Sequence, residues 1–394
     1  MAFNGRGSNF YLKMLASEIG NTINKAASNR AKGWYTPFMA AASRAIAERI
    51  PLVDFVLEVR DARIPLSSEC ELLTNHLASS RRIIVMNKMD LANRSQLKDW
   101  IKYFEHRNCI SYGLNSHNKE NVKKFLNFLQ AQIKGLKNID HSCSTITMMM
   151  VGIPNVGKSA LANSLHQVGR ISAAEKGKLK HAKVSPHPGE TKDIISMKIA
   201  SHPNIYVMDT PSILPPQILD TEVCCKLALT AGAISDCLIS EKELAQYFLA
   251  ILNFSDEYKK WEKLSTLEND RSCIDHKEEC SSSRQPDMKR ERQNFTDHTQ
   301  DFIVHNVRRM LFEKISYFDG DVQNEVDLQK LIELQLTALR EAFHLPLELG
   351  DDARSKVATK LLNLYRTGRL GHYTLDPLAM ELTDTEITQK ERAG

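Results

Sequence analysis

The stretch Val151-Gly152-Ile153-Pro154-Asn155-Val156-Gly157-Lys158-Ser159 decides the fold of this 394-residue chain. It matches the pattern G-x-x-x-x-G-K-[ST], in which the backbone N–H groups of a glycine-rich loop surround phosphate oxygens. The apolar run 145–151 before it is typical of a buried strand, and residues 159–168 after it carry apolar side chains at helical spacing. We therefore predict a strand, a phosphate-binding loop and a helix. The alternative, an ordinary glycine-rich turn, does not need Lys and Ser at its end.

Each residue type in this loop has a chemical role. Gly152 and Gly157 let the backbone curl, and the start of the helix adds partial positive charge. Lys158 is expected to bridge phosphate oxygens and to contribute to catalysis, and the Ser159 hydroxyl is expected to hold Mg²⁺. The residues of this loop that we expect to contact nucleotide are Asn155, Val156, Gly157, Lys158, Ser159 and Ala160.

A second motif, Asn87-Lys88-Met89-Asp90, follows an apolar strand expected at 82–86. The Asp90 carboxylate can accept two hydrogen bonds from the guanine edge, where adenine offers a different pattern, so this residue selects GTP over ATP. Asn87 either contacts the base or ties this loop to the phosphate loop, and the stem of Lys88 stacks on the ring. Alone the motif is weak, because a polar turn would look the same. Beside a phosphate loop it predicts guanine binding.

Two further segments complete the expected site. Asn115 and Ser116 follow an expected strand at 109–114, where a backbone group could contact the guanine oxygen. Asp209 ends an expected strand at 205–208 and is the natural partner of Mg²⁺. Thr191 lies in a segment that could close over the metal, and its hydroxyl is expected to reach Mg²⁺ and to assist catalysis. Between the loop and Thr191, the basic segment 170–183 is either an RNA-touching switch loop or a solvated one.

The order of these motifs is unusual, because the guanine motif precedes the phosphate loop and Asp209-Thr210-Pro211 comes last. The chain thus resembles the YlqF/YawG family of circularly permuted GTPases. The resemblance rests on Asp61-Ala62-Arg63-Ile64-Pro65-Leu66-Ser67, on Asn87 to Asp90, on the phosphate loop, on Pro188-Gly189-Glu190-Thr191 and on Asp209 to Pro211, and returns at 365–376. It implies a permuted P-loop α/β domain with a mainly parallel sheet, GTP and GDP as ligands, and assembly of the large ribosomal subunit as the task.

The resemblance also implies roles for residues where the chain keeps or departs from the family pattern. Asn155 matches the position linked to K⁺, which could accompany Mg²⁺. Ser212 replaces the glycine whose N–H senses the γ-phosphate, and we expect it to contact nucleotide. Phe38 replaces a histidine associated with hydrolysis, and the apolar Ile213 stands where other GTPases orient water with Gln. Together these departures predict good GTP binding and slow hydrolysis.

Residues 1–33 are basic, poor in acidic residues and able to form an amphipathic helix. Such a start is typical of an organellar transit peptide, although a basic arm that binds RNA or stays disordered would look alike. We predict mitochondrial localisation, with chloroplast or cytosol as alternatives. The eight cysteines show neither zinc spacing nor a disulfide pattern. No apolar run reaches the length of a membrane span, which leaves peripheral association open.

We expect a GTPase domain over 34–216 and a small all-α domain over 217–394, with a disordered polar insertion at 255–300. A net charge of +4 permits an RNA partner without requiring one, and we expect no DNA partner. A basic helix near the C-terminus is expected to contact ribosomal RNA, unless it is only a solvated face. The residues expected to do so are Lys356, Lys360, Arg366 and Arg369.

These features predict a GTPase that assembles the large ribosomal subunit in mitochondria and binds it, with its rRNA, in a GTP-gated way. Two alternatives stay open. One is a GTP-gated ribosome-binding factor with negligible hydrolysis, which Phe38 and Ser212 favour. The other is a regulatory GTPase that acts away from ribosomes, for which the sequence offers neither a lipidation site nor an amphipathic membrane helix.

Overall fold

A computed structural model describes residues 8–28, 35–76, 81–136, 145–172, 193–201, 203–216, 218–230, 234, 240–263, 298–346 and 350–378. The chain divides into two compact units. The first, here the helical unit, comprises Met1–Ala16 and Ser240–Gly371. The second, here called the GTPase unit because it contains the segment expected to form the GTPase domain, comprises Ser17–Ile239 and His372–Gly394.

The GTPase unit is built on one six-stranded sheet of order β3-β2-β1-β4-β6-β5. All neighbouring strands run parallel except β5, which pairs with β6 in the antiparallel sense. The carboxyl ends of β1, β2, β3, β4 and β6 therefore share one edge, where parallel sheets place their ligand sites. The strands are β1 (Phe55–Asp61), β2 (Arg82–Asn87), β3 (Ile110–Gly113), β4 (Ile146–Val151), β5 (Ile195–Ser201) and β6 (Asn204–Asp209).

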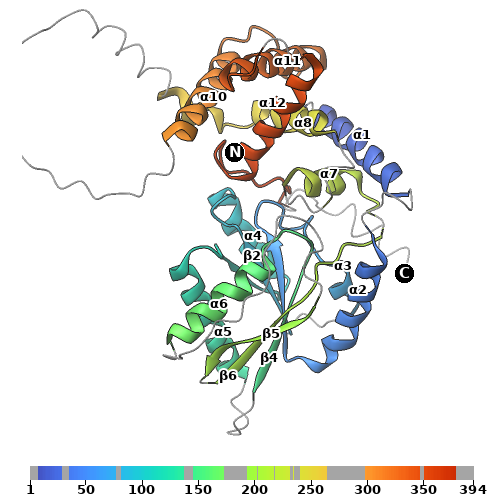
Figure 1. Ribbon diagram of the computed structural model, residues 1–394, viewed down its shortest axis with the longest axis vertical. Helices are drawn as coiled ribbons and strands as arrows, with labels where there is room; N and C mark the ends of the chain where they lie inside the picture. The colour runs from blue at the N-terminus through green and yellow to red at the C-terminus, as the bar shows by residue number, and fades with distance from the viewer. Residues whose placement is uncertain are drawn as a thin grey trace, which may run out of the picture. The chain divides into compact units, whose positions relative to one another are not determined.

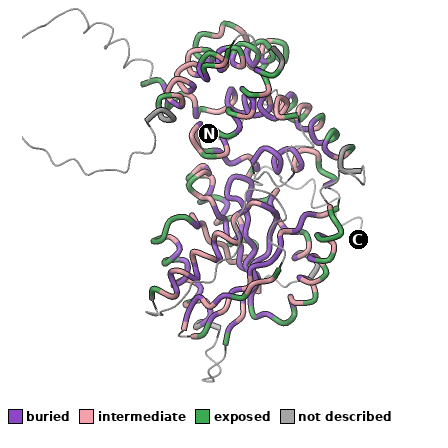
Figure 2. Tube along the Cα trace, viewed as in Figure 1, coloured by how far each residue is buried: buried purple, intermediate pink, exposed green. Residues whose placement is uncertain are grey.

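Helices cover both faces of this sheet (Figure 1). On one face α5 (Lys119–Leu136) lies beside α6 (Lys158–Ser172), and on the other lie α2 (Pro37–Arg49) and α3 (Glu71–His76). Buried residues concentrate along the strands between them (Figure 2). The α2 helix begins where the sequence allows it, because the Thr36 hydroxyl accepts a hydrogen bond from the Met39 N–H and Pro37 occupies the first turn.

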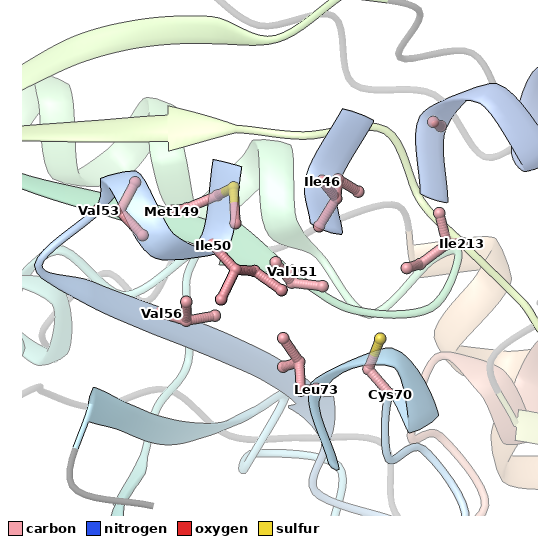
Figure 3. Close-up of a cluster of buried hydrophobic side chains, with 10 residues drawn as sticks. Ile46, Ile50, Val53, Val56, Cys70, Leu73, Met149, Val151 and Ile213 are labelled. Carbon is pink, nitrogen blue, oxygen red and sulfur yellow. The ribbon is translucent and has the colours of Figure 1, made fainter. Parts of the chain in front are cut away.

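Two apolar clusters fix these helices on the sheet. In the first, Ile46 of α2 meets Val151 at the end of β4, and Ile213 lies in the same cluster (Figure 3). The cluster continues into the short 3-10 helix η1 (Ile50–Leu52), which joins α2 to β1. In the second, α4 (Arg94–His106) inserts Trp100 and Phe104 against β2. The sequence analysis had predicted neither α3 nor α4.

Segments from both ends of the chain complete the GTPase unit. The later part of α1 (Ser8–Ser28) buries Ile19 and Ile23, and the Asn24 amide donates to the Ile218 carbonyl at 3.1 Å. Helix α7 (Thr221–Thr230) also belongs to this unit, although we expected the helical domain to begin at residue 217. We had expected 34–216 alone to form the GTPase domain, whereas the compact unit takes in residues 17–33, 217–239 and 372–394.

The helical unit contains α8 (Glu241–Phe254), η4 (Tyr258–Trp261), α10 (His298–Ser316), α11 (Glu325–Ala342) and α12 (Gly350–Arg366). Asn253 and Gln335, both buried, exchange two amide hydrogen bonds of 3.0 and 2.6 Å between α8 and α11. Residues 255–263 were expected in the disordered insertion, yet η4 lies there with Trp261 buried. Residues 264–297 of that insertion lie outside the described part of the chain.

Candidate functional site

The predicted motifs meet at the carboxyl edge of the sheet. The phosphate loop follows β4, Asp209 ends β6 and Asn87 ends β2. Asn115 and Ser116 follow β3 by two and three residues. The strand-loop-helix expected around the phosphate loop is present as β4, residues 152–157 and α6.

Two glycines and one asparagine shape the phosphate loop. Gly157 has a φ of +95°, which favours glycine, and Asn155 has a φ of +60°. A Cβ on Gly152 would collide with the Val59 carbonyl, and one on Gly157 would collide with the Asn87 amide. Both glycines are therefore required by close approach of neighbouring groups, and Gly157 also by its positive φ.

Asn87 ties the guanine side of the site to the phosphate side. Its Nδ2 donates to the Val156 carbonyl at 2.8 Å, and its Oδ1 accepts from the Ser116 N–H at 3.1 Å. The Ser116 carbonyl in turn accepts from the Ser164 hydroxyl of α6 at 2.8 Å. Two roles were left open for Asn87, and these hydrogen bonds correspond to the second, in which Asn87 ties its own loop to the phosphate loop.

Lys158 is buried at the centre of the phosphate side, with 4% of its surface exposed. Its Nζ donates to the Ile153 carbonyl at 2.9 Å and to the Ser212 hydroxyl at 2.6 Å. Burial lowers its pKa to about 8, although Asp209 nearby favours the charged form. A phosphate group would supply the negative charge that this buried ammonium lacks.

Ser159 and Asp209, two of the residues expected to hold Mg²⁺, lie side by side. The Ser159 hydroxyl lies 2.7 Å from Asp209 Oδ2. Asp209 is fully buried, and its Oδ1 has no hydrogen-bond partner among the described residues. Burial raises the pKa of this carboxyl. A hydroxyl and a buried carboxylate with one vacant oxygen fit the oxygen ligands that Mg²⁺ prefers. Thr191, the third expected metal residue, lies outside the described residues.

Near the expected guanine contacts, Asp61, Arg63 and Lys88 form a cluster of charges that was not predicted from the sequence. Asp90, the residue expected to bind the base, is exposed. Lys88, with a φ of +59°, places its Nζ 3.0 Å from Asp61 Oδ2, and Arg63 binds the same oxygen at 2.8 Å. Burial alone would raise the pKa of Asp61, but Arg63 and Lys88 outweigh it and hold the pKa well below its usual range. The ion pair between Asp61 and Arg63 could have been predicted from the sequence, because an acidic and a basic residue lie two positions apart at the end of a strand.

We call residues 61–68 the DAR loop; the C-terminal segment closes it. Asp376 Oδ2 accepts from the N–H groups of Leu66 and Ser67, both at 2.8 Å, and its Oδ1 accepts from the Ser67 hydroxyl at 2.5 Å. The Leu375 N–H donates to the Arg63 carbonyl at 2.7 Å. Lys226 of α7 pairs with Asp376 at 3.4 Å. Residues more than 300 positions apart thus hold one loop of the site.

Phe38 lies beside the segment that follows β6. It is 37% exposed on α2 and lines a small apolar hollow with Ala41, Ala42, Ala45, Ile194 and Pro211. Ile213, by contrast, is buried in the cluster between α2 and β4 (Figure 3). Of these two residues, only Phe38, which departs from the family pattern, presents an exposed side chain near Pro211.

The four basic residues expected to contact RNA do not share one face. Lys356 and Lys360 are exposed and one turn apart on α12, whereas Arg366 comes six residues later and points about 120° away. Lys356 pairs with Asp352 at 2.8 Å, and the Lys360 ammonium lies 5.5 Å from the centre of the Phe343 ring. The Arg369 carbonyl accepts hydrogen bonds from the Arg308 guanidinium.

Comparison with known proteins finds a matching family model and relatives that cover most of the chain. A family model described as "50S ribosome-binding GTPase" matches residues 147–275. The chain is 59% identical over 363 residues to "DAR GTPase 2, mitochondrial" of Arabidopsis thaliana, which covers 92% of this chain and 95% of that one. The chain belongs to the circularly permuted GTPases of the YlqF/YawG family.

Other members of these permuted GTPases are more distant. "Ribosome biogenesis GTPase A" of Bacillus pumilus is 31% identical over 243 residues, which cover 60% of this chain and 81% of that one. The solved structure of GNP-bound YlqF from T. maritima aligns with a TM-score of 0.46 at 18% identity, over 86% of this chain and 98% of that one. No helix within the described ranges combines the length and apolar character needed to cross a bilayer.

Proposed function

We propose that this permuted GTPase binds GTP and GDP at the carboxyl edge of its sheet, hydrolyses GTP, and acts in assembly of the large ribosomal subunit in mitochondria. The observation that carries the proposal is the joint placement of Lys158, the Ser159–Asp209 pair and the Asn87 tie. The same placement supports the remaining nucleotide contacts proposed here, at Lys88, Asp90, Asn115, Asn155, Val156, Gly157, Ala160 and Ser212. Mg²⁺ held by Ser159 and Asp209, with Thr191 as third partner, would neutralise charge on the phosphates.

Guanine selection tests the nucleotide part of this function. Asp90→Asn should shift preference from GTP toward xanthosine triphosphate, because the amide reverses one hydrogen-bonding partner. Asp99→Asn, an exposed carboxylate on α4, is the matched control and should change nothing. Equilibrium titration with GTP, XTP and ATP measures the effect. Equal affinity of the parent protein for ATP and GTP would sink the assignment.

The part of the proposal that concerns the ribosome rests on the names of the relatives and on the basic residues of α12. The Bacillus relative is named for ribosome biogenesis and the Arabidopsis relative for mitochondria. We propose that rRNA contacts Lys356 and Lys360 on one face of α12, and Arg366 and Arg369 on another part of the helical unit. Lys356→Glu with Lys360→Glu should reduce co-sedimentation with large subunits in the presence of a non-hydrolysable GTP analogue. Lys330→Glu on α11 is the control, because Lys330 is likewise exposed and paired with an aspartate. Unchanged co-sedimentation of the double variant would remove α12 from the interface.

We also propose that residues 1–33 direct import and that processing leaves residues 17–28 in place. Ile19 and Ile23 are buried in the GTPase unit, so their removal would expose part of its core. A fluorescent reporter fused to residues 1–33 tests import, and a diffuse cytosolic signal would reject it. Mass spectrometry of the imported protein locates its first residue, and a start beyond Ile23 would contradict the retained helix.

K⁺ is proposed as a second cation beside Asn155. GTP hydrolysis on large subunits should then be faster in potassium than in sodium buffer, and Asn155→Ser should reduce the difference. Equal rates in both buffers would leave Mg²⁺ as the only cofactor.

A second candidate function is favoured by Phe38, which brings no hydrogen-bonding group to the surface beside Pro211. In this alternative the protein is a GTP-gated binding factor with negligible hydrolysis. Single-turnover hydrolysis on isolated subunits separates the two: a turnover indistinguishable from the uncatalysed reaction, with GTP-dependent binding intact, favours the binding factor.

A further inference from the structure

Ser212 occupies an unusual place in the phosphate site. Its hydroxyl lies 2.6 Å from Lys158 Nζ and belongs to a residue that is only half-buried. Among the described residues, the other hydrogen-bond partner of this ammonium is the Ile153 carbonyl, at 2.9 Å. Within the described part of the chain, Ser212 therefore supplies the one side-chain oxygen bound to the phosphate-loop lysine. A glycine at this position would leave Lys158 without it.

The chain on both sides of Ser212 is anchored, so this contact is set by the fold. On one side the Thr210 hydroxyl donates to the Met150 carbonyl of β4 at 2.6 Å, and Thr210 is fully buried. On the other side Ile213 is packed into the apolar cluster between α2 and β4. Two anchors three residues apart leave Ser212 little freedom to move away from Lys158.

The position of the hydrogen bond between Ser212 and Lys158 indicates which phosphate of a bound nucleotide would compete with the Ser212 hydroxyl. The lysine of a phosphate loop reaches the β- and γ-phosphates, and the metal bridges oxygens of the same two groups. In this chain the metal pair is Ser159 and Asp209, and Ser212 follows Asp209 by three residues. The Ser212 hydroxyl thus occupies a position on the ammonium that binds these phosphates, and a γ-phosphate oxygen bound to Lys158 would compete with it.

We propose that Ser212 determines the balance between GTP and GDP, because its hydroxyl holds the position at Lys158 that a γ-phosphate oxygen must take. Binding of GDP leaves the bond between Ser212 and Lys158 in place. Binding of GTP breaks it, and part of the attraction between Lys158 and the γ-phosphate is spent on replacing it. The inference rests on the proposed nucleotide site and adds to it a residue that disfavours the triphosphate.

The test compares affinities for GDP and for a non-hydrolysable GTP analogue in Mg²⁺ buffer, by titration calorimetry on the full chain. Ser212→Ala should tighten binding of the analogue by about tenfold, since a hydrogen bond to a charged group no longer has to be broken. The affinity of Ser212→Ala for GDP should stay within about twofold of the parent's, because GDP binding breaks no bond between residue 212 and Lys158 in either protein. Ser212→Thr restores the hydroxyl and should return the ratio of the two affinities toward that of the parent.

Controls separate this role from a structural one. Ser196→Ala, an exposed serine on β5, should change neither affinity. If Ser212→Ala weakens both nucleotides alike, or leaves the ratio of affinities unchanged, Ser212 only supports the loop and the proposal is overturned. If the parent binds neither GDP nor the analogue, the nucleotide site itself is wrong. A parent that binds both, with an unchanged ratio in Ser212→Ala, refutes the role of Ser212 alone.

Discussion

The phosphate loop and the DAR loop lie at the same edge of one sheet, yet they are held in different ways. The phosphate loop is shaped by its own glycines and is bonded to side chains of nearby segments, among them Asn87, Asp209 and Ser212. The DAR loop depends on Asp376, which supplies three hydrogen bonds from the far end of the chain. The first loop can be recognised in a short stretch of sequence, whereas the second is complete only when distant segments meet.

The sharpest test of this difference is Asp376→Ala. Two backbone N–H groups and a hydroxyl lose a buried acceptor, and Lys226 loses one of its two carboxylate partners. The free energy of unfolding should fall by about 4 kcal/mol, as when one member of a buried charged network is removed. Denaturant unfolding measures it, with Asp99→Ala as a control on an exposed helix. A loss under about 1 kcal/mol would mean that the DAR loop holds itself.

Asn87→Ala should affect the phosphate loop by removing its tie to the segment that follows β3. The Val156 carbonyl and the Ser116 N–H would lose their partner in a buried site. We expect GTP affinity to fall about 100-fold, corresponding to roughly 3 kcal/mol. Asn127→Ala, exposed on α5, is the control. If affinity is retained, the glycines alone shape the loop and the contrast between the two loops becomes stronger.

The two loops also differ in how much of their structure could be predicted from the sequence. The order of Asp90, Lys158 and Asp209 identified the permuted fold, and β4 and α6 lie where the motif placed them. Helix α4 could have been found from its Asn93 cap, whose side chain accepts from the Ser95 and Gln96 N–H groups. The contact of Asp376 with the DAR loop could not, because nothing in a local pattern links residues 310 positions apart. Helix α7 was expected in the helical domain but belongs to the GTPase unit; its apolar run is compatible with either.

The pH dependence of stability sharpens the comparison from the side of the phosphate loop. The pKa of Lys158 falls from 10.5 to about 8 on folding, so the unfolded chain holds this proton more tightly. The free energy of unfolding of the nucleotide-free protein should therefore rise between about pH 8 and 10.5, by roughly 2 to 3 kcal/mol. Lys158→Met should lose this rise, as thermal unfolding at several pH values can show. An identical slope in both proteins would assign the effect to other groups.

For Asp61 in the DAR loop the sign is opposite. Its pKa is lowered on folding, so the stability it contributes is present above the ordinary carboxyl pKa and is lost only as pH falls through its depressed value. The two loops should thus respond at opposite ends of the pH scale.

The smallest expected effect concerns Phe38. A polar side chain beside Pro211 could orient the attacking water, and Phe38→His should raise turnover on ribosomal subunits by about tenfold, which is about 1.4 kcal/mol in the barrier. GTP affinity should change little, because the binding residues are elsewhere. Phe38→Leu is the control for a change of shape. A fast parent enzyme that gains nothing from histidine would mean that another residue positions the water.

The contact between Asp376 and the DAR loop has a consequence for how the protein is made. Residues 61–68 leave the ribosome early in synthesis, but their partner is added some 300 residues later, after the whole helical unit. Loops closed over such a separation form slowly, because the intervening chain must be ordered first. The GTPase unit is therefore completed last. A chain that terminates before residue 376 keeps every nucleotide-binding motif and still lacks the residue that secures the DAR loop.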